Sequence, residues 1–505
     1  MQHQRGGKKK QDNMVKTTRG YRMVLIKKVI IHIFIISLLL SACYSQKPNH
    51  FLEDLDYMLD VLENNFSLFD LANWAKDVDI NDIFDNLKRS VLSDPNMDIN
   101  TFYELLWKSF YPLHWSTGHF SVISPDDYYQ RTQGSMIVLN QAFLPDSSRY
   151  PLSSPLRLRE PHVVNFYEPG YSRELTIGET IHISEWEDYI YEWFAFRAER
   201  FGEKELGQNF LRAIQEENYV DAYRYLGQID NLIKSIPNVH TNIIESGKIA
   251  YLALESFMNT PGSIAGNSER SQIIDFISEV KDFEHLIIDL RTNTGGSSNY
   301  FFDLFISTNI LSRQTVEGFA FFTHGDYTDE FLNARQSGLI GRIVCPISRL
   351  RTIDDDLLTV SEIISRYDLS GFNMSDMNRM DYGFPVVLEI GANPGILSSQ
   401  MKINSKIWLL ISEYSMSAAH IVTWVVKEIG FATLVGQTTG GYWGGYRSYS
   451  ALPNTGILFQ FDMFYLTDRY GYPLEAGIKP DYFNYEGMDA LETVLALINN
   501  GKSKN

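Results

Sequence analysis

A short stretch around residue 417 holds the side chains of this sequence that are best suited to chemistry. Residues 415–419 read Ser-Met-Ser-Ala-Ala, and Glu475 lies 58 positions after Ser417, in a Glu-Ala-Gly-Ile-Lys-Pro-Asp segment. A hydroxyl is a weak nucleophile at its ordinary pKa, so a catalytic serine needs a base within hydrogen-bond reach and donors for the developing oxyanion. A candidate nucleophile followed by a candidate orienting carboxylate therefore indicates serine hydrolase chemistry.

The elements on either side of Ser417 would place it at the start of a helix. The apolar run 408–411 predicts a strand before it, and residues 418–428 predict a helix after it. A helix N-terminus offers unpaired N–H groups and a partial positive charge to an oxyanion. The structural alternative is that Ser415 and Ser417 only cap the helix.

A second apolar run, residues 286–290, leads into Gly295 and Gly296. Glycines let backbone amides approach a substrate without obstruction by a Cβ atom, so these amides could line an oxyanion hole. The alternative is a tight turn between a strand and a helix, which any α/β protein can contain.

Hydrophobic spacing divides the chain into regions that would position these groups. Residues 44–125 repeat apolar residues at helical spacing and predict an N-terminal helical bundle, with Asp98 or Asn100 capping its last helix. Residues 126–245 predict a middle α+β region with helices at about 186–201 and 206–236, the first of them rich in core aromatics. Residues 246–490 alternate strands, loops and helices around an insertion at about 324–383, and 491–505 form a tail. The predicted fold class is α+β.

The N-terminus has the pattern of an export signal. Lysines and arginines precede the apolar run Val29–Leu40, which ends in Leu-Ser-Ala-Cys. A charged segment, a short apolar segment and small residues are typical of a secretory signal over residues 1–43, or from Met23 if that is the true start. The ending resembles a bacterial lipobox, which would make Cys43 a lipidated first residue; an ordinary signal peptide or a retained anchor are the alternatives. Tyr44 at the next position favours the outer membrane by resemblance to the bacterial sorting rule.

Composition limits the remaining classes of partner and cofactor. The 505 residues carry a net charge of −18, which disfavours nucleic acid because phosphate recognition rests on basic patches. With Cys43 modified, only Cys345 is left, so no intrachain disulfide is expected and Cys345 reads as a small buried apolar residue. The eleven histidines show no metal-ligand spacing, and neither a metal nor a cofactor is predicted.

Several segments together resemble one peptidase family. In chain order they are Phe-Glu-His-Leu-Ile-Ile-Asp-Leu-Arg-Thr-Asn-Thr-Gly-Gly, Glu-Tyr-Ser-Met-Ser-Ala-Ala-His, Leu-Val-Gly-Gln-Thr-Thr-Gly-Gly, Leu-Pro-Asn-Thr-Gly-Ile and Glu-Ala-Gly-Ile-Lys-Pro-Asp. Their order resembles the S41 peptidases, which include the C-terminal processing (tail-specific) proteases and the tricorn core protease. The resemblance covers about residues 51–122 and 247–485. It implies a ClpP/crotonase-like ββα spiral core and peptide substrates.

The resemblance also implies roles for individual residues. Ser417 matches the nucleophile, and the amide of Ala418 with that of Gly295 or Gly296 would form the oxyanion hole. Processing proteases use a lysine base in a block where this chain has Tyr442. A tyrosine with an ordinary pKa near 10 is a poor base at neutral pH, so the Ser-Lys dyad is not expected.

The tricorn-like branch uses a histidine and a glutamate instead, which match His119 and Glu475. Imidazole titrates near neutral pH and can shuttle the serine proton, while Glu475 would orient the ring. Two departures from that branch are Gly118, where tricorn has a serine linking histidine to glutamate, and His420, where many members have glutamate. Glu475 would then reach the ring directly or through Ser116, Thr117 or a water, and His114 competes with His119 as base.

The sequence therefore predicts an exported, membrane-tethered serine endopeptidase of carboxy-terminal processing type that acts on unfolded or short peptides. One alternative is a catalytically inactive peptide- or ligand-binding lipoprotein on the same scaffold, because a fold does not fix function. Another is an esterase or amidase that acts on cell-envelope material. The oligomeric state is left open, as is the presence of a divergent PDZ-like domain in the middle region.

Overall fold

The chain is described by a computed structural model that covers residues 49–114, 117–123, 188–258, 264–336, 343–345, 349–353, 357–393, 399–441 and 445–501. The leader with Cys43, most of the first half of the middle region, Ser116, Tyr442 and the side chain of Cys345 lie outside the described residues, so the predictions made for them stay predictions. The described elements from Asp54 onward belong to one compact unit.

Five helices come first: α2 (His50–Asn65), α3 (Phe69–Lys76), α4 (Ile80–Ser93), α5 (Ile99–Ser109) and α6 (Tyr111–His114). The predicted cap at Asp98 is confirmed, because its carboxylate accepts the Thr101 N–H at 2.8 Å at the start of α5. The apolar faces of α4 and α5 are buried, with Phe84 and Phe110 in edge contact. These helices therefore pack through their apolar faces, as the spacing of apolar residues predicts.

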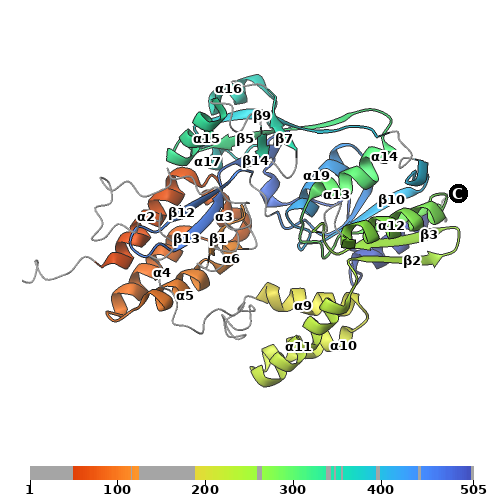
Figure 1. The fold of residues 1–505 in the computed structure, drawn as a ribbon, viewed down its shortest axis with the longest axis horizontal. Coiled ribbons are helices and arrows are strands. Elements are labelled where there is room, and N and C mark those ends of the chain that lie inside the picture. Colours follow the sequence, from red (N-terminus) through yellow and green to blue (C-terminus); the bar gives the residue numbers. More distant parts are fainter. Residues whose placement is uncertain are drawn as a thin grey trace, which may run out of the picture. The chain divides into compact units, whose positions relative to one another are not determined.

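A small antiparallel sheet joins these helices to the C-terminal third of the chain. It has the order β1 (Ser121–Ile123), β13 (Leu458–Asp462), β12 (Arg447–Ala451), and Ser121 pairs with Gln460. Figure 1 shows the blue strands β12 and β13 among the orange and red helices. This pairing between distant segments brings the residues just before β1 next to the end of β13.

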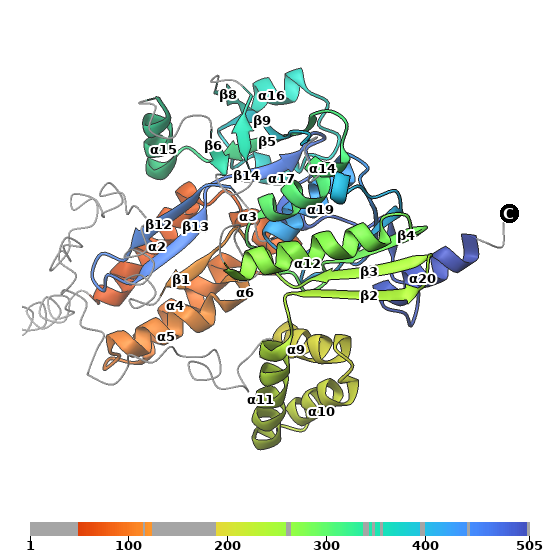
Figure 2. The same cartoon turned by 45° about the vertical axis from the view of Figure 1, so that its right-hand side comes forward.

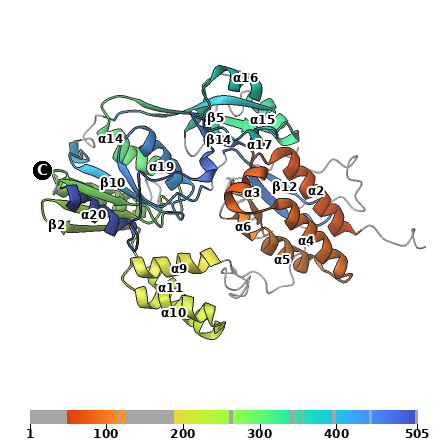
Figure 3. The same ribbon diagram turned by 180° about the vertical axis from the view of Figure 1, so that it is seen from behind.

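The larger core is a six-stranded sheet with the order β15 (Tyr482–Phe483), β11 (Thr433–Gly436), β10 (Lys406–Ile411), β4 (His285–Asp289), β3 (Ile249–Leu254), β2 (Val239–Glu245). All neighbours are parallel except β2 and β3. Residues of both parities along β4 and β10 are buried, which fits central strands covered on both faces. Figure 1 shows α12 (Ile264–Val280) and α19 (Ala418–Glu428) on the near side, and Figure 3 shows α20 (Ala490–Gly501) on the other.

A second sheet contains the segment that the sequence marks as an insertion. Its order is β14 (Tyr465–Asp468), β5 (Gln314–Phe322), β9 (Tyr382–Ile390), β7 (Leu350–Thr352), β6 (Ile343–Cys345), with β8 (Leu358–Thr359) also on β9. The paired strands are antiparallel. Helices α15 (Asp326–Gln336), α16 (Val360–Arg366) and α17 (Met374–Met377) accompany it, and α13 (Ser298–Phe301), η3 (Phe302–Ile306) and α14 (Ser307–Asn309) lead into it.

The described part of the middle region is helical up to β2, with α9 (Asp188–Arg200), α10 (Lys204–Gln215) and α11 (Tyr219–Ser235) packed together (Figure 2). The pattern over 206–236 predicts one helix, and the structure has two, because Glu217 takes a left-handed φ of 53° and Asn218 caps the next helix. Of the aromatic-rich segment, Tyr191 is buried with Phe210 in the core of the three helices, whereas Trp193, Phe194 and Phe196 are half-buried.

The predicted α+β class is confirmed, while the likeness to a crotonase-type spiral stays a prediction. Within the described ranges, no helix combines the length and the apolar character that a bilayer crossing requires. In the same residues, no group of three or more His, Cys, Asp or Glu side chains is arranged to hold a metal ion.

Candidate active site

Ser417 lies in the turn between β10 and α19, as the sequence predicts. Its backbone has φ 50° and ψ −119°, a conformation that L-residues rarely adopt, and its N–H donates to the Gly441 carbonyl at 3.0 Å. Although Ser417 occupies the N-cap position of α19, its side chain makes no capping hydrogen bond. Ser415, in contrast, has a structural role, because its hydroxyl donates to the Leu290 carbonyl at 2.8 Å. A strained turn with an uncommitted hydroxyl fits a nucleophile better than a cap.

The Gly295-Gly296 pair lies against this turn. A Cβ atom at position 295 would come within 2.8 Å of the Ser417 Cβ, and one at position 296 within 2.4 Å of the Phe257 carbonyl. Both residues also have positive φ angles, of 112° and 124°. Only glycine fits such positions, so the absence of side chains here brings backbone amides next to Ser417.

The hydrogen bonds of this loop select between the two candidate amides. The Gly295 N–H already donates to the Asn293 side chain at 2.9 Å, and the Gly295 carbonyl accepts from Phe257. The N–H groups of Gly296 and Ala418 find no acceptor among the described residues. The pair available to an oxyanion is therefore Gly296 with Ala418, rather than Gly295.

The structure brings His119 to Ser417 across 298 positions of sequence. The His119 Nε2 lies 3.4 Å from the Ser417 Oγ, a separation that suits a pair which tightens when substrate binds. The backbone at this position is held from β13: Gln460 donates to the His119 carbonyl at 2.8 Å, and the Asp462 N–H donates to the Gly118 carbonyl at 2.8 Å.

Gly118 adopts a backbone conformation that favours glycine. Its φ is 51°, and a Cβ atom there would lie 2.5 Å from the Leu68 Cδ1. A serine at this position would be strained, and the Leu68 side chain would have to move to admit it.

The carboxylate on the histidine ring is that of Asp462, and the expectation that Glu475 occupies this place is corrected. The Asp462 Oδ2 lies 2.6 Å from the His119 Nδ1, and the Asp462 side chain is fully buried. Glu475, in η4 (Leu474–Ala476), instead accepts the Gly118 N–H at 2.7 Å through its Oε1. The β1–β13 pairing explains the exchange, because it places the end of β13 directly beside the ring.

The surroundings of His119 favour the neutral form of its ring. Burial lowers the pKa of His119; the Asp462 carboxylate opposes this shift, and the positive charge of Arg447 adds to it. Arg447 Nε lies 3.9 Å from the other Asp462 oxygen. A neutral imidazole with Nδ1–H held by a carboxylate presents its basic Nε2 to the serine, as a general base must.

This depressed pKa gives a testable pH dependence. The acidic limb of kcat/KM is expected below the ordinary histidine value of 6.5, because the free ring must lose its proton before it can act as a base. Arg447→Gln removes a charge that lowers the pKa, so the limb should move to higher pH. Arg313→Gln, which changes an exposed arginine far along the chain, should leave it in place. A limb that moves to lower pH in Arg447→Gln would contradict this electrostatic account.

The two other candidate histidines have structural roles. His114 is buried, its Nε2 accepts the Val122 N–H at 3.1 Å, and burial lowers its pKa to about 3. His420 is fully buried with its Nδ1 at 2.8 Å from the Thr439 Oγ1, and burial with the charge of Lys76 lowers its pKa to about 3. The same Thr439 oxygen accepts the Ile478 N–H, so this hydroxyl links the His420 ring to the backbone. Neither ring is bonded to Ser417.

Sequence reasoning missed two charged residues near the site. Asp462 had a signal, because Gln460 and Asp462 put polar groups on one face of a strand whose other residues are apolar. Lys76 had none: its Nζ donates to the Gly440 carbonyl at 2.8 Å, next to the residue that binds the Ser417 N–H. Burial lowers the pKa of Lys76, and the Glu475 carboxylate opposes that shift.

Comparison with known proteins gives a family for the core of the chain. Residues 248–483 match the model of peptidase family S41. No curated protein matches the sequence significantly. Among solved structures, a candidate peptidase from Parabacteroides merdae is similar at 16% identity over 88% of this chain and 95% of that one, with a TM-score of 0.44. Mature CPAF in complex with lactacystin is similar at 13% identity over 86% of this chain and 93% of that one, with a TM-score of 0.44. Tricorn protease is similar at 17% identity over 50% of this chain and 18% of that one, with a TM-score of 0.23.

Proposed function

We propose, on the premise that the chain belongs over residues 248–483 to peptidase family S41, that it is a serine peptidase with Ser417 as its nucleophile. The observation that carries the proposal is one line of contacts. Ser417 Oγ lies 3.4 Å from His119 Nε2, and His119 Nδ1 lies 2.6 Å from Asp462 Oδ2. Nucleophile, base and orienting carboxylate in this order form the arrangement that activates a serine hydroxyl.

The reaction would proceed in two halves. Ser417 Oγ attacks the carbonyl carbon of a peptide bond while His119 Nε2 takes the hydroxyl proton, and Asp462 stabilises the imidazolium. The oxyanion accepts hydrogen bonds from the Gly296 and Ala418 N–H groups. The amine then leaves with the proton from His119, and a water activated by the same ring hydrolyses the acyl-enzyme.

The sequence supports a substrate class and a type of cleavage. The resemblance to tail-specific proteases supports unfolded or short peptides as substrates and cleavage of the carboxy-terminal processing type. Export and a lipid anchor at Cys43 stay predictions from the leader. A silent binding protein is the less favoured alternative, because binding alone does not require a strained serine in line with a histidine and a buried aspartate.

A fluorophosphonate probe tests the proposal directly. The folded protein should react with the probe once per chain, with the adduct on the peptide that contains Ser417, and should release fragments from casein. Protein unfolded in urea is the control and should not react, because the base and the oxyanion donors no longer surround the hydroxyl. Folded protein that neither reacts nor cleaves casein would favour the binding protein, and turnover of simple esters without casein would favour an esterase.

A further inference from the structure

Helix α9 of the middle region touches both loops that would form the oxyanion hole. The Phe196 ring lies 5.6 Å from the ring of Tyr414, in the loop that leads to Ser417. The same ring lies 5.9 Å from the Arg291 guanidinium, at the start of the loop that leads to Gly296. The C-terminal half of α9 therefore faces the two segments whose relative position sets the distance between the Gly296 and Ala418 amides.

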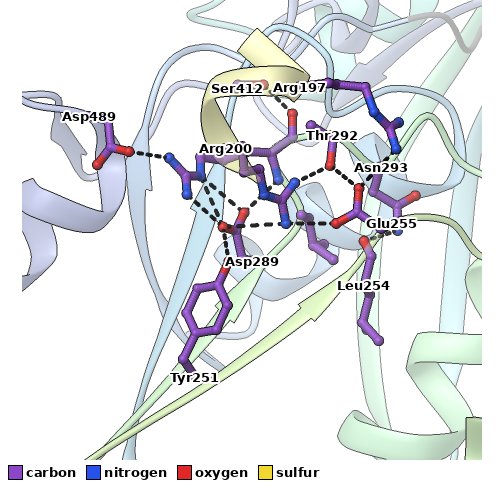
Figure 4. A network of polar contacts seen from close by, with 12 residues as sticks. Arg197, Arg200, Tyr251, Leu254, Glu255, Asp289, Thr292, Asn293, Ser412 and Asp489 are labelled. Atoms are coloured by element: carbon purple, nitrogen blue, oxygen red, sulfur yellow. Dashed lines mark hydrogen bonds and ion pairs between the residues drawn. The ribbon is translucent and has the colours of Figure 1, made fainter. Parts of the chain in front are cut away.

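Arg200, the last residue of α9, is buried in this contact (Figure 4). One of its terminal nitrogens lies 2.9 Å from Glu255 Oε1 and 3.5 Å from Asp289 Oδ2, and the other donates to the Thr292 hydroxyl. Its side chain is only 4% exposed. One guanidinium thus contacts three positions of the core: it hydrogen-bonds Thr292 and forms ion pairs with Glu255 and Asp289. Its Nε and the nitrogen of the ion pairs find no hydrogen-bond acceptor among the described residues.

Thr292 connects this guanidinium to the glycine loop. Its hydroxyl accepts from Arg200 and donates to Glu255 Oε2 at 2.6 Å, so both hydrogen-bonding directions are used. The next residue, Asn293, holds the Gly295 N–H with its side chain, and its carbonyl accepts the Met416 N–H at 3.1 Å. Only these short links separate Arg200 from both oxyanion donors.

Asp289 and Arg200 stabilise each other's charged forms. Burial would raise the pKa of Asp289, but the positive charges of Arg200 and Arg291 hold it well below its ordinary value. Burial likewise opposes the charge of Arg200, and Asp289 and Glu255 raise its pKa nonetheless. Buried ion pairs are costly to desolvate and are weak stabilisers for that reason. A role in positioning the loop that leads to Gly296 explains these buried ion pairs better than stability does.

We propose that Arg200 is a positioning residue for the oxyanion hole, which acts through Thr292 on the placement of the Gly296 N–H. The proposal rests on the proposed function. It gives helix α9 an indirect part in the chemistry, through the placement of a backbone amide. Because oxyanion donors are used most strongly in the tetrahedral state, a misplaced Gly296 amide should lower kcat with little change in KM.

Arg200→Gln tests the proposal. We expect kcat to fall by about 10-fold to 100-fold, KM to change less than about 3-fold, and the affinity for a peptide boronate to fall as kcat does. The pH midpoint of the acidic limb should not move, since His119 keeps its partners. Arg197→Gln removes a 3.4 Å ion pair to Glu255 and cation–π contacts with Trp193 and Phe201, none of which involves Thr292, and should have a smaller effect. Lys204→Gln removes an exposed pair near the same helix end and should have none.

Thr292→Val is the second variant, because it removes the connecting hydroxyl and leaves both charges of the Arg200–Glu255 pair in place. It should give the same fall in kcat and boronate affinity, and it decides the matter if Arg200→Gln does not fold. If the wild type is active and the folded variants keep its kcat and boronate affinity, the positioning role of Arg200 is overturned and the proposed function stands. Wild-type protein without turnover or labelling would overturn the proposed function and this inference with it.

Discussion

Ser417→Ala is expected to lower kcat/KM for a peptide substrate by about 10⁴-fold or more, and His119→Ala by a similar factor. The alanine at 417 leaves no atom to form the acyl bond. The alanine at 119 leaves a hydroxyl that is not deprotonated at neutral pH, with no other base bonded to it among the described residues. Since the two side chains act as one unit, the double variant should be little slower than either single one. Initial rates on a quenched peptide, with binding of the same peptide measured separately, check this.

Two controls separate loss of chemistry from loss of fold. Ser278→Ala and His324→Ala replace the same residue types at exposed positions and should keep full activity. The thermal unfolding midpoint of Ser417→Ala should stay near that of the wild type, because the Ser417 side chain makes no capping hydrogen bond. His119→Ala removes the ring partner of the buried Asp462 carboxylate, so its midpoint should fall, and circular dichroism at the assay temperature should show that this variant is folded. If His119→Ala retained most of the activity, the base would have to be another group. The proposed roles of His119 and Asp462 would then be wrong.

The convergence of Ser417 and His119 could be predicted from motifs, while its physical cause could not. Segments around both residues resemble blocks of one family, which implies proximity without showing how it arises. The cause is the pairing of three residues of β1 with β13, a long-range contact that leaves no periodicity in either segment. Strand pairing of this kind depends on the whole fold, so a local pattern cannot reveal its register.

The role of Glu475 shows the opposite limit of motif reasoning. The motif correctly indicates a buried carboxylate near the histidine, and Glu475 is indeed bound to the residue that precedes it. Which oxygen meets which donor depends on shifts of a few ångströms, and here the ring is met by a strand residue outside every motif. Arg200 is a similar case, because a charge at the end of a helix usually lies in solvent, and its partners Glu255 and Thr292 lie far along the chain.

The second large loss of activity is expected at Asp462, because this residue and not Glu475 contacts the His119 ring. Asp462→Asn is expected to lower kcat/KM by about 10³-fold to 10⁴-fold. The aspartate accepts a hydrogen bond from Nδ1–H and so leaves Nε2 free to take the proton of Ser417. An asparagine can turn its amide N–H toward Nδ1, which favours the tautomer with the proton on Nε2. That ring would donate toward Ser417 rather than accept from it, so the loss should appear in kcat while peptide binding is kept.

Glu475→Gln should cost much less, about 10-fold, because the glutamine oxygen can still accept the Gly118 N–H, although the charge on that hydrogen bond and the attraction to Lys76 are lost. Asp329→Asn, at an exposed carboxylate paired with His324, serves as the control and should have no effect. The order of the two losses is the decisive result. A Glu475→Gln variant slower than Asp462→Asn would return the orienting role to Glu475. A larger loss in Asp462→Asn would establish a triad of Ser417, His119 and Asp462 from three separate parts of the chain. Glu475 would then have a structural role, because it binds the backbone N–H of Gly118, next to His119.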